Sequence, residues 1–286
     1  MRSCDIEKVK ENYFDFLASR FILIYICWQI QQHMSSKVKL LQKQAQATPI
    51  LLSSWMEGNG VSRFDQSDMV RRHWLKRLAN GVYHFDGFHP TLYAVLHSYI
   101  KLQNADYTLG ASTALYLRGY YHYGYIGNLP VFLYSPTNKH IPAWIMRHEW
   151  NYQLNTFSTN IFRHSCIGVE NITLEGFEVL ASSLERAFME CLLLSPTHYD
   201  LIDLYYTMEM LTTLRPKVVQ QLLEQCSSVK VKRLFLFMAE KANHKWVDAI
   251  NLSQVDIGKG VRSFANKGVY NGKFKIVIPK ELHEYE

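Results

Sequence analysis

The amino-acid sequence predicts an α/β (α+β) protein that has an N-terminal winged helix-turn-helix and a larger mixed α/β domain with a helical back half. Three observations predict this fold class. Two short helical patterns meet at a glycine turn near residue 60, a hairpin signal follows at Asn80-Gly81, and apolar runs with helical spacing dominate after residue 183. The 286 residues, 48% of them hydrophobic, are enough for two folded domains.

The N-terminal pattern begins with three helices. Apolar residues at near-helical spacing predict the first over residues 36–47. Thr48 can cap a second helix and Pro49 is tolerated at its first position, so we expect that helix from Pro49 to Glu57, where a Gly-Asn-Gly turn ends it. Ser62 stands three residues before Asp65, which is the spacing of a capping box, and predicts a third helix that runs to about residue 73.

A strand hairpin is predicted directly after the third helix. Apolar residues alternate with polar or basic ones between Trp74 and Phe85, around Asn80-Gly81, the dipeptide most typical of a two-residue hairpin. This hairpin would be the wing. The winged helix-turn-helix is therefore expected over residues 34–86, and a turn cluster separates it from a second domain over residues 90–286.

The charge of the chain is concentrated in this N-terminal part. The formal net charge is +6, and the segment from Met34 to Phe85 holds eight Lys or Arg against three acidic residues. Such an excess attracts polyanions, of which duplex DNA is the first candidate. Charge alone leaves open a solvated basic face, and small winged helices also serve as protein-docking modules.

The candidate DNA contacts are polar side chains of the third helix and basic side chains at the entry to the hairpin. A helix that follows a short turn and begins with polar and basic residues is typical of a recognition helix, which enters the major groove. Basic residues in the hairpin can reach phosphate groups and add affinity without sequence information. The predicted contacts are Arg63, Gln66, Ser67, Arg71, Arg72, Lys76 and Arg77.

The second domain is predicted to mix strands with helices. Helices are expected over residues 90–103 and 110–118, a short buried strand over 130–136, and strands over 152–162 and 166–174. The chain then becomes helical over 183–194, 200–214, 216–225 and 230–242, and ends in a strand over 272–278.

The first 33 residues form a separate segment. Their apolar run, Phe21 to Trp28, is about half of the ~20 residues that a membrane-spanning helix needs, and no small-residue cleavage site follows it. Met34 resembles an ordinary protein start, so the hypothesis for residues 1–33 is an N-terminal extension upstream of the native start. The five cysteines form no CxxC pair, which favours a reducing, cytoplasmic location without a membrane partner.

The sequence carries no recognisable catalytic or metal-binding motif. None of the twelve histidines falls in an HxH or HExxH spacing, and GxSxG, Walker and GxGxxG motifs are absent. We therefore expect no enzyme, no catalytic residue, no cofactor and no metal. A nuclease or transferase with a DNA-targeting domain is the enzymatic alternative, and it would require metal-dependent turnover.

Two N-terminal segments carry a resemblance to a known family, the AbiEi antitoxins of type IV toxin–antitoxin systems, also called abortive-infection antitoxins. Leu51 to Arg63 (LLSSWMEGNGVSR) and Arg71 to Tyr83 (RRHWLKRLANGVY) resemble the family's tryptophan-bearing helix, turn, basic helix and wing. His73 stands where the family usually has glycine. Residues 107–119, 182–192 and 256–279 resemble later family segments in the same order, so the resemblance spans most of residues 37–282.

The resemblance implies a repressor that binds duplex DNA at its own promoter and also neutralises a co-expressed, cognate nucleotidyltransferase toxin. A winged-helix regulator of other genes with no toxin partner is the alternative. The downstream gene distinguishes the two, because only the antitoxin is expected beside a nucleotidyltransferase reading frame.

Overall fold

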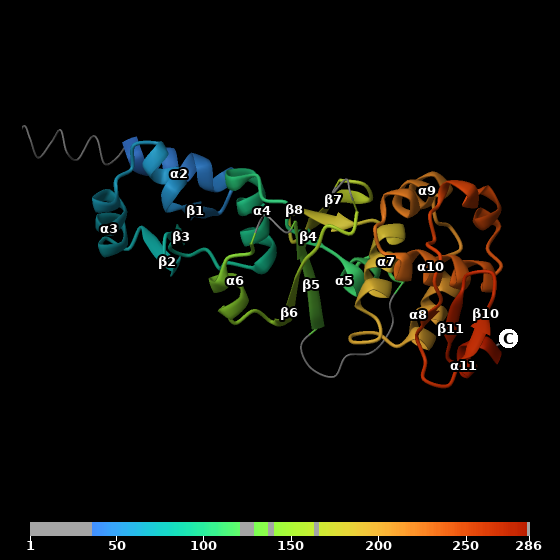
Figure 1. Ribbon diagram of the computed structural model, residues 1–286. Coiled ribbons are helices and arrows are strands. Elements are labelled where there is room, and N and C mark those ends of the chain that lie inside the picture. The colour runs from blue at the N-terminus through green and yellow to red at the C-terminus, as the bar shows by residue number, and fades with distance from the viewer. Residues whose placement is uncertain (1–35, 121–128, 137–139, 163–165, 285–286) are drawn as a thin grey trace, which may run out of the picture. The chain divides into compact units, whose positions relative to one another are not determined.

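The computed structural model describes residues 36–120, 129–136, 140–162 and 166–284 (Figure 1). They form two compact units that are divided after Leu102, later than the boundary expected between residues 86 and 90. Helices and strands are mixed, and the predicted fold class is confirmed. The hypothesis for residues 1–33 lies outside the described residues. No described helix is both long and apolar enough to cross a membrane.

The N-terminal unit is a winged helix. Its helix over residues 36–47 is followed by a three-stranded antiparallel sheet in the order β1-β3-β2, with two helices between β1 and β2 (Figure 1). The turn between β2 and β3 is Asn80-Gly81, as predicted. The elements after the first helix are β1 (Ile50–Leu52), α2 (Ser53–Gly58), α3 (Arg63–Arg71), β2 (Leu75–Ala79), β3 (Val82–Phe85) and α4 (Leu92–Gln103).

The expected second helix is wrong over its first residues. Ile50, Leu51 and Leu52 form strand β1, and the helix begins only at Ser53. All three apolar side chains are buried, and their backbones pair with β3. A short apolar run has the same appearance in a buried strand and in a buried helix, so the pairing with a distant strand decides its conformation.

Helix α4 packs with the N-terminal unit, although the sequence places it in the second domain. His97 Nε2 lies 2.9 Å from the carbonyl oxygen of Ala47, and the backbone N–H of Ile50 donates to Ser98 Oγ at 3.2 Å. These contacts connect α4 to the start of β1. The last helix of the N-terminal unit therefore closes the base of the winged helix.

A small apolar core fixes α3 against the rest of the winged helix. Met69 of α3 packs with Leu41 of the first helix, Met56 of α2 and Leu75 of β2, all of them buried. Because these side chains come from four elements, the orientation of α3 relative to the hairpin is set by packing and not by a loop.

The C-terminal unit is built on a five-stranded mixed sheet in the order β6-β5-β4-β8-β7. Strand β4 pairs antiparallel with β5 and parallel with β8, while β5 and β6 are parallel. Helices α5 and α7 lie against this sheet (Figure 1). The elements are β4 (Thr108–Leu109), α5 (Ala111–Tyr116), β5 (Leu129–Ser135), α6 (Ala143–Arg147), β6 (Tyr152–Ser158), β7 (Val169–Leu174), β8 (Phe177–Ser182) and α7 (Leu184–Leu194).

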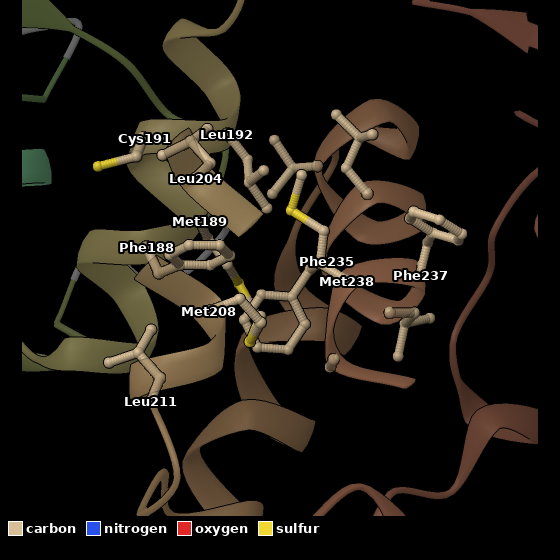
Figure 2. Packing of buried hydrophobic residues seen from close by; sticks show 14 of the residues in the cluster. Phe188, Met189, Cys191, Leu192, Leu204, Met208, Leu211, Phe235, Phe237 and Met238 are labelled. Carbon is tan, nitrogen blue, oxygen red and sulfur yellow. The ribbon is translucent and has the colours of Figure 1, made fainter. Parts of the chain in front are cut away.

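The predicted helical back half follows. Figure 2 shows its core, in which Phe188 and Met189 of α7, Met208 of α8 and Phe235 of α10 meet. The rings of Phe188 and Phe235 lie edge to face, 5.9 Å apart. The elements are α8 (Leu201–Met210), α9 (Pro216–Gln225), α10 (Val229–Lys241), the 3-10 turns Lys245–Ala249 and Leu252–Gln254, β9 (Arg262–Ser263), β10 (Val269–Asn271), β11 (Ile276–Ile278) and α11 (Lys280–Glu284).

Candidate nucleic-acid interface

The predicted capping box sets the start of α3. The backbone N–H of Asp65 donates to Ser62 Oγ at 3.2 Å, and the N–H of Ser62 donates to Asp65 Oδ2 at 2.9 Å. Lys37 Nζ of the first helix also contacts Asp65 Oδ2, at 2.6 Å. Burial raises the pKa of Asp65, but the hydrogen bonds from Lys37 and Ser62 outweigh burial and lower it overall. The start of α3, where Arg63 directly follows the cap, is therefore fixed by these three contacts.

Gln66 lies on the inner side of α3, contrary to the expectation that it faces outward with the other polar residues. Its side chain is only 1% exposed. Its amide nitrogen donates to the carbonyl of Val61 at 3.0 Å, and its amide oxygen accepts from Ser53 Oγ at 2.7 Å. These bonds join α3 to the start of α2, so the contacts of Gln66 are those of a residue that positions α3.

The two basic residues of the hairpin point to opposite faces, because successive side chains of a strand alternate. Arg77 Nη2 donates to the hydroxyl of Tyr83 at 3.2 Å, and its guanidinium lies 5.5 Å from the centre of that ring. Lys76 instead pairs with Asp86 at 2.6 Å, and this hydrogen bond lowers the pKa of Asp86. Arg77 faces α3, whereas Lys76 lies on the opposite face of the hairpin.

A groove of about 320 Å³ lies between α3 and the hairpin, and we call it the α3–wing groove. It brings together four of the seven predicted residues. Its lining offers two guanidinium groups, hydroxyls and amides, and no carboxylate. Such a lining can bind phosphate oxygens or the polar edges of bases. The lining residues are Ser53, Arg63, Gln66, Ser67, Arg77, Asn80, Gly81 and Tyr83.

Arg63 is a highly accessible charge of the α3–wing groove. Its side chain is 85% exposed and pairs with Glu57 at 2.7 Å. The pairing lowers the pKa of Glu57 and raises the pKa of Arg63. Because solvent screens an ion pair this exposed, a phosphate or a base can replace the carboxylate at small cost.

The other predicted residues lie outside the α3–wing groove. Arg71 and Arg72, at the end of α3, both pair with Asp68, in the case of Arg72 at 2.7 Å. The guanidinium of Arg72 also lies 5.8 Å from the centre of the Trp74 ring. Together with Lys76, these residues are exposed basic groups outside the groove.

Sequence reasoning missed four lining residues of the α3–wing groove, of which Asn80 and Gly81 were predicted only as the hairpin turn. Tyr83 was not a candidate, yet its hydroxyl accepts the hydrogen bond that orients Arg77. The register of the hairpin, in which the two residues pair directly, could have indicated it. Ser53 lines the α3–wing groove because α2 begins there, which the wrong helix boundary concealed.

No metal centre is found in the part of the chain that the structure describes, where no three His, Cys, Asp or Glu side chains converge.

Two family models match the chain. Residues 34–125 match the N-terminal domain of the AbiEi antitoxin transcriptional regulators, and residues 129–279 match a model described as transcriptional regulator, AbiEi antitoxin, type IV TA system. No curated protein matches the sequence. The fold is similar to the crystal structure of RV2827C protein from Mycobacterium tuberculosis, at 14% identity and a TM-score of 0.54 over 86% of this chain and 91% of that chain.

Proposed function

Because the chain belongs to the AbiEi family of type IV antitoxin transcriptional regulators, we propose that it binds duplex DNA at its own promoter and represses its own operon. We further propose that it neutralises a cognate nucleotidyltransferase toxin. The observation that carries the DNA-binding part is the α3–wing groove, in which Arg63 at the start of α3 and Arg77 of the hairpin line one surface.

The arrangement suits the entry of α3 into the major groove. A recognition helix contacts base edges with the residues of its first turns, and these positions in α3 hold Arg63 and Ser67. An arginine can form two parallel hydrogen bonds with guanine, and a serine hydroxyl can bond to any base edge. Arg63 is therefore assigned to sequence reading, and Arg63→Ala is expected to relax sequence preference.

The basic residues around this contact are assigned to phosphate. Arg77 lies on the hairpin side of the α3–wing groove, and Arg71, Arg72 and Lys76 are exposed basic groups outside it. Phosphate contacts fix the register of a protein on DNA and add affinity that does not depend on sequence. Lys76→Ala is therefore expected to weaken binding to all duplexes about equally.

Repression is tested with a reporter gene under the promoter of the operon. The wild-type chain is expected to reduce expression, and the double variant Arg63→Ala/Arg77→Ala to restore it. Arg262→Ala is the matched control, because Arg262 is an exposed arginine of the C-terminal unit, and it should repress like the wild type. Repression by the double variant at the wild-type level, with equal protein amounts, would contradict the role of the α3–wing groove.

Neutralisation is tested by co-expression with the product of the adjacent gene, which the proposal requires to be a nucleotidyltransferase. The wild-type chain should restore growth, and so should Arg63→Ala/Arg77→Ala, because both substitutions lie on the proposed DNA surface of the N-terminal unit. A neighbouring product that is not toxic, or toxicity that the wild type does not relieve, would contradict the antitoxin role. If the protein still binds its promoter in that case, it is a transcriptional regulator without a toxin partner.

A further inference from the structure

Phe64 is the most exposed large apolar side chain among the described residues. It is 80% exposed and follows Arg63 at the start of α3. The winged-helix core takes its apolar side chains from other positions, including Met69 of the same helix. Because burial of a Phe side chain stabilises a fold, a ring left in water contributes nothing to the stability of this one.

The surroundings of Phe64 are polar and charged. Ser67, Asp68 and Arg71 lie three, four and seven residues further along α3, which places them on the same face of the helix. With Phe64 they line a shallow depression of about 150 Å³. Arg63 and Arg71, which flank the ring along the helix, are 85% and 75% exposed. The ring is thus a single apolar group on a basic surface.

A single apolar group on a basic surface fits duplex DNA better than the apolar face of a protein, which would need further exposed hydrophobic neighbours. Base edges in the major groove offer hydrogen-bonding groups and one apolar group, the 5-methyl of thymine. The 5-methyl of 5-methylcytosine occupies the same place on its ring. Phe64 stands in the first turn of α3, from which a recognition helix reaches bases.

We infer that the ring of Phe64 contacts the 5-methyl group of a pyrimidine in the major groove, an inference that rests on the proposed function. Phe64 recognises sequence through an apolar contact, in addition to the hydrogen bonds with bases assigned to Arg63. Thymine is the source in unmodified DNA, and 5-methylcytosine is the source in methylated DNA.

The test measures binding of the full chain to its own upstream duplex by fluorescence anisotropy. The duplex is made in three forms: unmodified, with deoxyuridine in place of thymidine, and with 5-methylcytosine in place of cytosine. Each form is titrated with the wild type, Phe64→Ala, Phe64→Leu, and Val261→Ala as a control at another exposed apolar residue, in the C-terminal unit.

Wild-type affinity is expected to change about fourfold per contacted methyl group, the effect of burying one such group. A loss with deoxyuridine identifies thymine, and a gain with 5-methylcytosine identifies the methylated base. Phe64→Ala should bind all three forms alike, Phe64→Leu should keep most of the discrimination, and Val261→Ala should behave as the wild type. Phe64→Ala is expected to fold normally because the ring is outside the core.

Two results would overturn the inference. If Phe64→Ala discriminates between the three forms as strongly as the wild type, or if the wild type binds all three equally, Phe64 does not read a methyl group although the protein binds DNA. If the wild type binds none of the forms, the proposed DNA-binding function fails, and the inference fails with it.

Discussion

Replacing Glu190 by alanine removes an acceptor that joins three elements of the C-terminal unit. The carboxylate of Glu190, on α7, is fully buried. It accepts hydrogen bonds from the backbone N–H of Ala111 at the start of α5 (3.0 Å), from Ser182 Oγ at the end of β8 (2.9 Å), and from Arg186 Nε (2.8 Å). Its loss leaves the guanidinium of Arg186, which is also buried, without this counter-charge.

The cost follows from the loss of this buried counter-charge. Removing one partner of a buried ion pair destabilises a protein by about 3–5 kcal/mol. For a unit of this size each kcal/mol lowers Tm by about 2–4 °C, so Glu190→Ala should melt roughly 6–20 °C below the wild type. Thermal denaturation followed by circular dichroism measures the difference.

Two further variants distinguish the effect of losing the buried counter-charge from the effect of losing any acidic residue. Glu224→Ala, at an exposed position of α9, should change the free energy of unfolding by less than about 0.5 kcal/mol. Arg186→Met/Glu190→Met should be less destabilised than the sum of the two single changes, because neither charge is then left alone. Glu190→Ala melting within about 2 °C of the wild type, or strict additivity of the methionine variants, would refute the reasoning.

Three other perturbations have expected outcomes. Burial raises the pKa of Glu185, but hydrogen bonds from Arg215 outweigh burial and lower the pKa from 4.5 to about 2. The carboxylate therefore adds stability that is present above pH 4.5 and lost as the pH falls toward 2. In acid unfolding, Glu185→Gln should lose less stability than the wild type across that range. His73 has φ 59°, so His73→Gly should stabilise the N-terminal unit by up to about 1 kcal/mol in urea unfolding, and a lower midpoint would contradict this. Gly81 has φ 71°, so Gly81→Val should cost about 1–2 kcal/mol and weaken DNA binding, whereas Gly81→Asn, which tolerates this backbone, should cost less.

Local signals predicted much of the N-terminal unit. The Ser62 capping box and the Asn80-Gly81 turn are short-range chemistry, in which the residues that decide the conformation are neighbours in sequence, and both are confirmed. His73 adopts left-handed backbone, a conformation in which glycine carries no steric cost.

Long-range contacts decided what the sequence could not predict. β1 is a strand because its backbone pairs with β3, thirty residues away in the chain, and no local pattern separates it from a helix. Gln66 is polar and lies on a helix with exposed arginines, yet its amide forms hydrogen bonds inside the unit, with Ser53 and Val61. Polarity alone therefore groups Gln66 with the exposed arginines, although its side chain is buried.

The salt dependence of promoter binding tests most directly whether the α3–wing groove is the DNA interface. The logarithm of the binding constant falls linearly with the logarithm of salt concentration, by about 0.9 per phosphate contact. Arg77→Ala should reduce the slope by about 0.9 relative to the wild type, and Arg262→Ala should leave it unchanged. Equal slopes for the wild type and Arg77→Ala, measured on the same duplex, would contradict the assignment of DNA to this groove.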